Sequence, residues 1–563
     1  MLVIPAKAGI HCCAAIIHLP CGAMDPRLRG DDGGLRLQLN KRYFVMYIFL
    51  ITLIAALLVI FGYRRLLFIT KFMQQQNNYN YRLWRFAYLQ RNIIDKRVAI
   101  PSLIAAVGFV LMPNTVWAAI PAAALGIAVI REKNPLKGGI KPLVMTPRIK
   151  RMFWTAFILW TLTVLFFTVS LFKMLIIVPI MALAAPLFIM AANKIMAPVE
   201  WLNGRKYIIE GRRNLEKYNP TVIAITGSFA KTSMKNILHH ILSSASTSLT
   251  TKRSINTLMG LVRVAREELN SDYKFFVAEV GMGAPGQIIE IAKFLNPKHG
   301  MIMSVGTKYF ENFKRGQDGI AKELFVLSKY IARRGGRTMI NAESVAPEFI
   351  KKYAAPNDII IDGDIATDIK QKRDGIYFTV NYGGEKTKLF APVFGTHQAK
   401  NIAMAFIMAR DLGVPKDSIV QALKSLPQTE HRLEVKEEGG LTILDDSYNS
   451  NMSGFISAME LGESFRKKGQ KFIVVTPGMV SLGDLHAEQH SAVGKVANKL
   501  ADKVIAIGAD RIRDFTNEIL PEKLVEAASQ TEARAWIASN TKPGDIVLYE
   551  NDLPDLYVEK ISV

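Results

Sequence analysis

Long apolar runs dominate the part of the chain before residue 200. Residues 44–63 contain no charge, residues 98–130 contain none either but are broken by Pro113 and Asn114, and residues 152–192 contain only Lys173. A helix needs about 20 apolar residues to cross a bilayer. We therefore predict a multi-span α-helical membrane region over residues 44–200. About five spans are expected, at residues 44–63, 98–112, 115–130, 152–172 and 174–192.

From residue 220 onward, short apolar runs alternate with longer amphipathic segments. This alternation favours parallel, doubly wound α/β sheets. The strand-like runs lie at residues 221–226, 275–281, 299–306 and 337–342, and a second set lies at 441–447, 471–478, 503–509 and 545–550. We therefore predict two α/β domains, at residues 220–428 and 429–563, preceded by a polar connector at residues 201–219.

Residues 1–43 differ from both parts, because they are rich in turn residues and charge and show no sustained period. They are similar to translated intergenic repeat sequence, so we predict a non-native or disordered extension, with Met46 as the more natural start. This stretch also holds all three cysteines, Cys12, Cys13 and Cys21. A disulfide framework and a zinc ribbon are therefore excluded for the rest of the chain.

Basic residues gather in the polar segments between the apolar runs. The chain has a formal net charge of +23, with eight Lys and Arg against one acid over residues 64–97 and seven against one over residues 131–151. Such loops face the cytoplasm. This orientation places everything after Asn193 in the cytoplasm and makes membrane lipid the expected partner of the basic charge. No aromatic and basic side chains interleave as on a single-strand-binding surface, so nucleic acid is not an expected partner.

The segment TGSFAKTS, residues 226–233, follows a strand-like run and precedes a helix-like stretch. A loop in that position directs backbone N–H groups and the positive end of the helix toward phosphate. Lys231 would reach a terminal phosphate, and the Thr232 hydroxyl would bind Mg²⁺. The spacing is shorter than that of the common phosphate-binding loop, so the segment alone fits an ordinary strand-to-helix turn equally well.

Four further segments accompany this loop. They are AEVGMGAPGQI at residues 278–288, GTHQAKN at 395–401, DDSYNSN at 445–451 and LGDLHAEQH at 482–490. Together with ITGSFAKTS, they make residues 220–550 resemble the Mur ligases, the ATP-dependent amide-bond ligases of peptidoglycan precursor synthesis, and most closely their D-alanyl-D-alanine-adding (MurF-type) branch. The resemblance implies a central P-loop ATPase domain, a C-terminal Rossmann-like α/β domain, and ATP and Mg²⁺ as cofactors.

The resemblance also implies a mechanism and a set of residues. ATP phosphorylates a substrate carboxylate, and an incoming amine then displaces phosphate from the acyl phosphate. Thr232 and Glu279 are expected to bind Mg²⁺. The residues expected to act in catalysis are Lys231, Glu279 and Lys322, the last as the family's carbamylated lysine. The residues expected to contact ATP are Gly227, Ser228, Lys231, Thr232, Ser233, His397, Asn401, Arg432, Asp446, Tyr448 and Asn449. A plain surface lysine at 322 and a core histidine at 397 are the alternatives.

The chain departs from the family pattern at several positions. Ala230 replaces the glycine before the loop lysine, which we expect to be tolerated if the residue keeps a negative φ. Tyr309 stands where a metal-binding histidine is expected, which weakens the case for a second Mg²⁺, and Met452 replaces a proline. The family's usual first domain, which holds the UDP of the precursor, is not recognised, and the predicted membrane spans stand in its place.

These features predict a membrane-anchored, MurF-like, ATP-dependent ligase in the bacterial inner membrane, with its catalytic domains in the cytoplasm. Its partners would be a muramoyl-peptide acceptor, soluble or lipid-linked, and an amino acid or dipeptide. Because the uridine-binding domain is not recognised, we hypothesise an acceptor that is lipid-linked or otherwise delivered at the membrane. Two alternatives remain: a nucleotide-binding scaffold or pseudoenzyme of cell-wall synthesis, and an enzyme that amidates a lipid-linked precursor.

Overall fold

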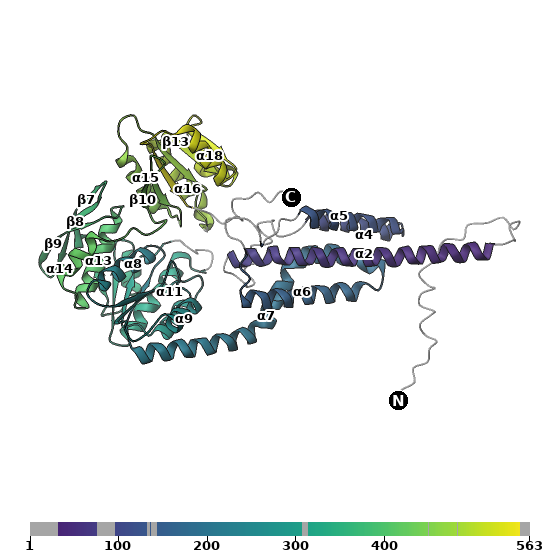
Figure 1. Cartoon of the computed structure of the whole chain (residues 1–563), viewed down its shortest axis with the longest axis horizontal. Coiled ribbons are helices and arrows are strands. Elements are labelled where there is room, and N and C mark those ends of the chain that lie inside the picture. Colours follow the sequence, from purple (N-terminus) through teal and green to yellow (C-terminus); the bar gives the residue numbers. More distant parts are fainter. Residues whose placement is uncertain are drawn as a thin grey trace. The chain divides into compact units, whose positions relative to one another are not determined.

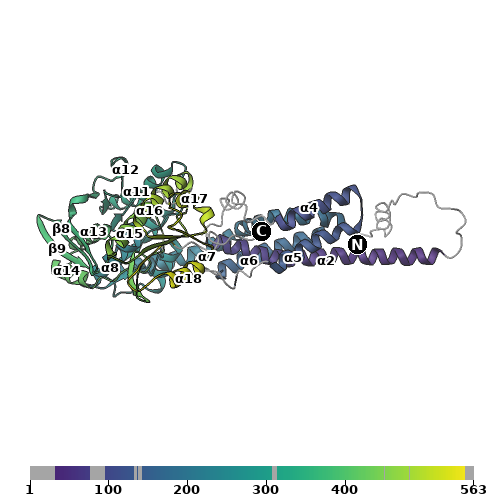
Figure 2. The same cartoon turned by 90° about the horizontal axis from the view of Figure 1, so that it is seen from above.

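The computed structural model describes residues 32–75, 96–131, 136, 143–306, 313–448, 450–480 and 482–551. The chain forms two compact units, one made largely of residues before Lys194 and one made of Lys194 and the residues that follow. Figures 1 and 2 show that the first unit is helical and the second is α/β. Most of the predicted extension lies outside the described residues, and its last part, from Asp32, belongs to the first described helix.

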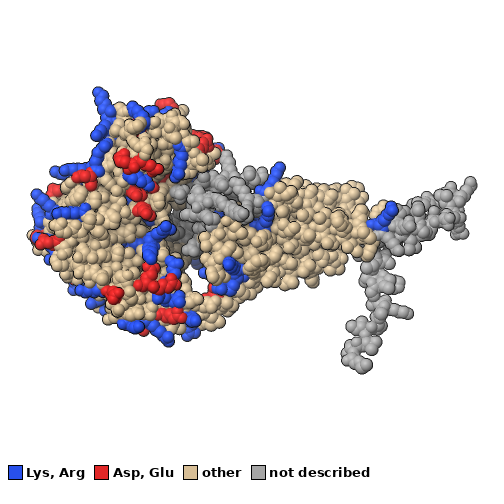
Figure 3. All heavy atoms as spheres, viewed as in Figure 1, with Lys and Arg blue, Asp and Glu red and all other residues tan. Residues whose placement is uncertain are grey.

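The first unit consists of helices. They are α2 (Asp32–Gln75), α4 (Lys96–Leu111), η1 (Thr115–Ala118), α5 (Ala119–Arg131), α6 (Pro147–Phe167) and α7 (Leu171–Tyr218). Among the described residues, three helical stretches are long and apolar enough to cross a membrane, at Arg42–Lys71, Pro147–Phe167 and Leu171–Tyr218, and Thr115–Arg131 is a shorter apolar helix. Figure 3 shows few charged side chains on the visible surface of this unit. The number of spans stays a prediction.

The turn between α4 and η1 lies where the sequence predicts it. Pro113 and Asn114 separate the two helices, and the Asn114 side chain accepts a hydrogen bond from the Val116 N–H at 3.0 Å. Gly108 allows the two arms to approach, since a Cβ there would lie 2.7 Å from the Trp117 ring. The uncharged run at residues 98–130 is therefore a helical hairpin.

The turn between α6 and α7 lies earlier than predicted. We expected it near Lys173, but the helix ends before Thr168, whose Oγ1 donates to the Leu165 carbonyl at 2.6 Å. Ser170 Oγ accepts a hydrogen bond from the Lys173 N–H at 3.2 Å, so Lys173 lies in the first turn of α7. Hydroxyl side chains at helix ends satisfy free backbone groups, and Thr168 and Ser170 do so at this turn.

The predicted polar connector at residues 201–219 is helical, because α7 continues to Tyr218. This segment belongs to the second unit, and its polar side chains contact other residues of that unit. Asn214 Nδ2 donates to the Ala265 carbonyl at 3.0 Å, and Arg266 pairs with Glu210 at 2.8 Å. The polar character of this segment therefore reflects contacts of a helix rather than a loop.

The second unit begins with a six-stranded parallel sheet in the order β2-β3-β1-β4-β5-β6. Its strands are β1 (Thr221–Thr226), β2 (Ser248–Thr250), β3 (Phe275–Glu279), β4 (His299–Ile302), β5 (Arg337–Asn341) and β6 (Ile359–Ile361). Helices α8 (Lys231–Ser243), α13 (His397–Asp411) and α14 (Lys416–Lys424) share a buried core with one face. Helices α9 (Leu258–Glu267), α10 (Gln287–Leu295), α11 (Gly316–Ala332) and α12 (Pro347–Tyr353) share a core with the other.

A three-stranded antiparallel sheet follows the parallel one. It consists of β7 (Ala366–Lys372), β8 (Gly375–Tyr382) and β9 (Glu385–Ala391), after the short helix η3 (Gly363–Ile365). The sequence analysis did not predict it, because β7 and β9 are largely polar and half-exposed along their length. Their buried residues join the core that α8 and α13 share.

The last part of the chain forms a second six-stranded sheet, in the order β10-β11-β15-β12-β13-β14, with only β10 antiparallel to its neighbour. Its strands are β10 (Glu434–Glu438), β11 (Leu441–Asp446), β12 (Phe472–Thr476), β13 (Lys503–Ile507), β14 (Leu524–Ala527) and β15 (Ile546–Glu550). The helices are α15 (Met452–Phe465), η4 (Gly483–Leu485), α16 (His486–Leu500), η5 (Ala509–Arg511), α17 (Arg513–Thr516) and α18 (Gln530–Asn540). Each of the eight predicted strand-like runs contains a strand, so the predicted α/β fold is confirmed.

His490 holds the loop that follows β12. Its Nε2 accepts a hydrogen bond from the Met479 N–H at 3.0 Å, so its Nδ1, 2.8 Å from the His486 carbonyl, carries the proton and donates. The side chain is 1% exposed, and burial lowers the pKa of His490 to about 4. The ring is therefore neutral at pH 7, with both nitrogens bonded.

We expect the protein to lose stability as the pH falls from 6.5 toward 4, because the unfolded chain binds a proton that the buried ring does not. This difference in pKa corresponds to roughly 2 kcal/mol lost between about pH 7 and pH 5. Replacing His490 by Gln should remove most of that loss. Denaturant unfolding of both proteins at the two pH values measures it, and an equal pH dependence in the two would contradict the assignment.

Candidate active site

The loop between β1 and α8 is fixed against the residues that follow β4. The Ser228 N–H donates to the Ser304 carbonyl at 3.1 Å, and the Phe229 N–H donates to Ser304 Oγ at 2.8 Å. The Gly306 N–H donates to Ser228 Oγ at 2.9 Å. Gly227 has φ +145°, and a Cβ there would lie 2.9 Å from the Ser304 nitrogen, so only glycine fits. These contacts fix the shape of the loop backbone.

Ala230 precedes α8 and adopts φ +64° and ψ −5°. We expected alanine to be tolerated here on the condition of a negative φ, and this condition is not met. The chain passes from strand to helix within the short loop after Thr226, and the left-handed conformation makes this turn at the position where the family pattern has glycine. A left-handed non-glycine residue costs on the order of 1–3 kcal/mol and persists where its surroundings impose it. The hydrogen bonds around Ser304 impose it here.

Replacing Ala230 by Gly should leave nucleotide binding intact and stabilise the protein by up to about 1 kcal/mol, because the relief of strain exceeds the extra freedom of the unfolded chain. Replacing it by Val should destabilise the protein by at least about 1 kcal/mol, since a β-branched residue resists the left-handed region. Denaturant unfolding of the three proteins measures both effects. A glycine variant less stable than the alanine protein would contradict the account of strain.

Lys231 is the first residue of α8, and its ammonium group lies over the loop. Its Nζ donates to the Gly227 carbonyl at 2.5 Å and to the Ser228 carbonyl at 3.3 Å. Burial lowers the pKa of Lys231 to about 8, with the Glu279 carboxylate acting in the opposite direction and Arg432 in the same direction. A bound phosphate would offer this cation better acceptors than the two carbonyls.

Thr232 and Glu279 form the pair expected to bind Mg²⁺. Thr232 Oγ1 donates to Glu279 Oε2 at 2.9 Å, and Asn256 Nδ2 donates to Glu279 Oε1 at 2.9 Å. The carboxylate, at the end of β3, is 1% exposed. A hydroxyl and a carboxylate in contact beside a phosphate loop are the hard oxygen donors that Mg²⁺ takes, so the residues fit this ion. Thr232 and Glu279 would hold it.

A cavity of about 180 Å³ brings the loop, this pair and the start of the C-terminal domain together. Arg432 and Tyr448 line it from the C-terminal side, with the guanidinium 4.2 Å from the centre of the Tyr448 ring. The lining residues are Ser228, Phe229, Ala230, Lys231, Thr232, Ser233, Ser254, Asn256, Glu279, Arg432 and Tyr448. Two cations therefore face one buried carboxylate across a polar cavity that can take the phosphates of a nucleotide.

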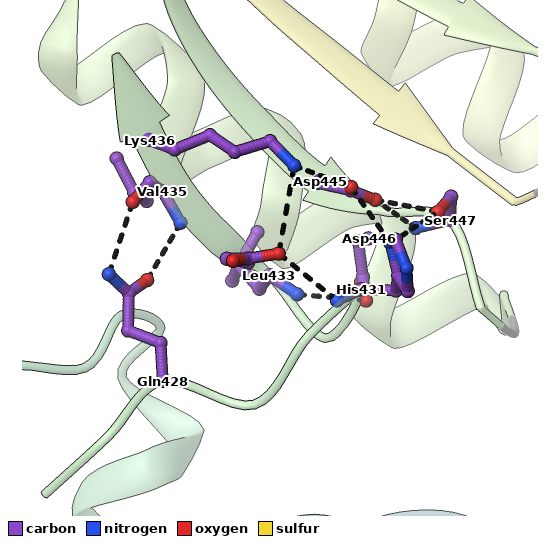
Figure 4. A network of polar contacts seen from close by, with 9 residues as sticks. Gln428, His431, Leu433, Val435, Lys436, Asp445, Asp446 and Ser447 are labelled. Carbon is purple, nitrogen blue, oxygen red and sulfur yellow. Dashed lines mark hydrogen bonds and ion pairs between the residues drawn. The ribbon is translucent and has the colours of Figure 1, made fainter. Parts of the chain in front are cut away.

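The backbone on both sides of Arg432 is left-handed, with φ +59° at His431 and +53° at Leu433. His431 Nδ1 lies 2.9 Å from Asp445 Oδ2, and the Leu433 N–H donates to Asp446 Oδ1 at 3.1 Å. Figure 4 shows these carboxylates beside the segment between α14 and β10, residues 425–433, which we call the linker. The network thus fixes the direction in which Arg432 leaves the chain.

Asp446 does not line the cavity, but lies behind it. Burial raises the pKa of Asp446 to about 6, against the effect of the nearby Arg432 guanidinium. Glu550 is its neighbour on β15, and burial together with Asp446 raises the pKa of Glu550 well above its usual range. Ser450 Oγ donates to Glu550 Oε1 at 2.6 Å. Asp446 therefore contacts the backbone beside Arg432 rather than the cavity, and its predicted role in nucleotide binding stays a prediction.

His431, Glu434 and Asp445 also place ligand atoms within 4.8 Å of one another. The Lys436 ammonium already lies 3.2 Å from Asp445 Oδ2 and 3.8 Å from Glu434 Oε2. Figure 4 shows Lys436 extended toward Asp445. This cluster is an ion-pair network of the linker, and no metal is assigned to it.

Some predicted site residues lie elsewhere. His397 is exposed at the start of α13, and Asn401 is buried and donates to Gln398 Oε1 at 3.1 Å; neither lines the cavity. Lys322 is exposed on α11 and does not line it either. Asn449 and Tyr309 lie outside the described residues. The roles of these residues stay predictions.

The sequence analysis missed three residues that shape the cavity. Ser304 holds the loop, Asn256 binds Glu279, and Lys235 lies 3.7 Å from Glu279 Oε2. Only Lys235 left a readable signal, since it stands four positions after Lys231 and therefore on the same face of the helix. Ser304 and Asn256 reach the site through the fold of distant segments.

Comparison with known proteins identifies the two α/β domains. Residues 225–409 match the Mur ligase middle domain, and residues 431–549 match the domain described as Mur ligase, glutamate ligase domain. The chain is 24% identical over 347 residues to the UDP-N-acetylmuramoyl-tripeptide–D-alanyl-D-alanine ligase of Bacillus subtilis, a match that covers 60% of this chain and 74% of the relative. The chain is 29% identical to the ligase of the same name from Borreliella burgdorferi, and this match covers 55% of this chain and 67% of the relative.

Solved structures show the same fold. MurF from Acinetobacter baumannii superposes with a TM-score of 0.55 at 24% identity, over 62% of this chain and 77% of that one. MurF ligase from Thermotoga maritima in complex with ADP superposes with a TM-score of 0.54 at 22% identity. This superposition covers 62% of this chain and 80% of that one. The two domain matches together cover more than half of the sequence. The chain therefore belongs to the Mur ligase family of ATP-dependent ligases.

Proposed function

We propose that this protein is a membrane-anchored peptide ligase that joins an amine to the carboxylate of a muramoyl-peptide acceptor at the cost of ATP. The observation that carries the proposal is the cavity in which Lys231, Arg432 and the Thr232–Glu279 pair converge. Two fixed cations and a pair of oxygen donors suit the transfer of a phosphoryl group, whose chemistry depends mainly on positioning and charge.

The residues of the cavity would have different roles in this reaction. The loop N–H groups, the start of α8 and Lys231 would hold the β- and γ-phosphates of ATP. Bound Mg²⁺, held by Thr232 and Glu279, would neutralise phosphate charge. Arg432 would stabilise the negative charge of the group in transfer. The acceptor carboxylate takes the γ-phosphoryl group, and ADP leaves. The amine then attacks the acyl carbon, and inorganic phosphate leaves.

For the substrates, we propose the pair that gives the two relatives their name. Those enzymes are named for joining D-alanyl-D-alanine to a UDP-N-acetylmuramoyl tripeptide. The dipeptide is therefore the first amine to test, and the nucleotide-linked tripeptide is the first acceptor. The phosphate loop and Glu279 lie within the match to the Mur ligase middle domain, and Arg432 lies within the match to the second Mur ligase domain, which supports the same chemistry here.

We further propose that the apolar helices anchor the enzyme in the inner membrane, with the ligase domains in the cytoplasm. The apolar stretches of α2, α6 and α7 and the basic residues around them support this placement. A second candidate acceptor is a lipid-linked muramoyl peptide. It is favoured by α7, which starts in an apolar stretch and ends at Tyr218, just before β1.

The test is phosphate release from ATP by the full chain in lipid nanodiscs, with D-alanyl-D-alanine and either the nucleotide-linked or the lipid-linked acceptor. Release that needs both amine and acceptor supports the ligase. Preference for the nucleotide-linked form would exclude the lipid-linked candidate. No release with any acceptor, although ATP binds, would favour the scaffold reading over the ligase.

A further inference from the structure

Lys235 is a buried cation that the proposed reaction does not use. It lies on α8 one turn after Lys231, its side chain is 0% exposed, and it does not line the cavity. An ammonium group without water is costly unless charged or polar partners surround it. The partners of Lys235 therefore indicate what the cation holds.

Lys235 connects two separate segments of the chain. Its Nζ donates to the Thr251 carbonyl at 2.7 Å and to the Arg253 carbonyl, both between β2 and α9. The same Nζ lies 3.7 Å from Glu279 Oε2 at the end of β3, and both side chains of this ion pair are at most 1% exposed. One cation thus ties the segment 251–256 to the carboxylate expected to bind Mg²⁺.

The segment 251–256 also contacts Glu279 directly, through Asn256 at its C-terminal end. Asn256 donates to Glu279 Oε1 at 2.9 Å, and Thr232 donates to Oε2 at 2.9 Å, so both carboxylate oxygens are held. Arg253 has φ +50°, a conformation that a non-glycine residue keeps only under restraint. The hydrogen bond from Lys235 to its carbonyl is such a restraint.

We propose that Lys235 is a positioning residue that locks Glu279 and the segment 251–256 together, so that Glu279 presents its carboxylate to the Mg²⁺ of a bound nucleotide in one orientation. Lys235 acts through Glu279, whereas Lys231 faces the phosphates. The inference rests on the proposed function, because it concerns the nucleotide of the same cavity.

Calorimetric titration of the full chain with ADP, with and without MgCl₂, tests the role without turnover. Lys235→Met should reduce the gain in ADP affinity that Mg²⁺ brings by at least about tenfold, as the loss of a residue that orients a metal ligand does. The metal-free affinity should change by less than about threefold, since Lys231 and the loop remain. Lys252→Met is the matched control, because Lys252 lies in the same segment with its side chain 76% exposed, and it should match the wild type.

The Glu279→Gln background separates positioning from a general effect on the fold. There, adding Lys235→Met should change the Mg²⁺-dependent affinity by less than about twofold, because the residue it acts through is already altered. If the methionine variant lacks a cooperative unfolding transition, Lys235→Gln keeps a donor for the carbonyls without the charge, and the same loss is expected.

Three results would overturn the inference: no loss, an equal loss with and without Mg²⁺, or the full loss again in the Glu279→Gln background. The proposed function fails separately. If the wild type bound ADP neither with nor without Mg²⁺, the cavity would not be a nucleotide site, and the role of Lys235 would fall with it. A wild type that binds Mg²⁺ and ADP beside an unaffected Lys235→Met would refute only the role of Lys235.

Discussion

Replacing Lys231 by Ala should lower ATP-dependent phosphate release by at least about 1,000-fold, because it removes the cation that lies over the phosphate loop. Its Nζ donates to the Gly227 carbonyl of this loop at 2.5 Å. No other lysine lines the cavity among the described residues. Phosphate release and amide formation, measured on the purified full chain, should fall together.

Lys298→Ala is the control for the Lys231 variant, since Lys298 is exposed just before β4 and does not line the cavity. It should keep wild-type activity. Turnover that persists in the Lys231 variant would show that ATP is used elsewhere. A protein that keeps its role in cells after this change, while release is lost, would act as a scaffold rather than as a ligase.

Replacing Glu279 by Gln should lower turnover at saturating ATP by at least about 100-fold, because the charged ligand expected for Mg²⁺ is lost while the shape of the side chain is kept. The change also leaves the fully buried Lys235 without its ion-pair partner. We therefore expect some loss of stability as well, of the order of 1–3 kcal/mol. Titration of activity against MgCl₂, together with denaturant unfolding, separates the two effects.

Glu290→Gln tests whether any lost carboxylate has such an effect, because Glu290 is exposed in the first turn of α10. It should behave like the wild type in both measurements. Wild-type turnover in the Glu279 variant, at any MgCl₂ concentration, would exclude Glu279 from the metal site.

Most of the predicted site residues that line the cavity lie at or just after the ends of strands. Glu279 ends β3 and the phosphate loop follows β1, and paired parallel strands bring their carboxyl ends to one edge of a sheet, whereas Asp446 ends β11 in the second sheet. A short apolar run followed by a polar residue is therefore a reliable sign of a position near such a site. Lys231 and Thr232 were found for a related reason, because a helix that starts after β1 points its first residues to the same edge.

The residues that sequence reasoning missed depend on contacts between distant segments. Asn256 reaches Glu279 only because the segment after β2 folds back over β3. Ser304 reaches the phosphate loop because β4 is paired with β1. The positive φ of Ala230 has the same origin, since these contacts outweigh the intrinsic preference of alanine. None of these constraints is local in the chain.

The structure also differs from the sequence-based expectations where the pattern of polar and apolar residues does not indicate the secondary structure. The polar segment 201–219, predicted as a connector, is the last part of the helix α7, and Glu210 in it pairs with Arg266 of α9. The strands β7 and β9 were missed because each buries only part of one face. Lys322 was assigned to the site by the family resemblance; its side chain is exposed on α11, and its role stays a prediction.

The central claim is that the cavity transfers the γ-phosphoryl group of ATP to a carboxylate. Its most direct test uses a muramoyl-peptide acceptor whose terminal carboxylate is labelled with ¹⁸O, together with ATP and D-alanyl-D-alanine, and mass spectrometry of the phosphate released. An acyl-phosphate intermediate transfers one labelled oxygen to each phosphate when the amine displaces it, so we predict singly labelled phosphate in step with amide formation. Phosphate without label would show that water, not the acceptor carboxylate, receives the phosphoryl group, and would contradict the assignment of this protein as a ligase.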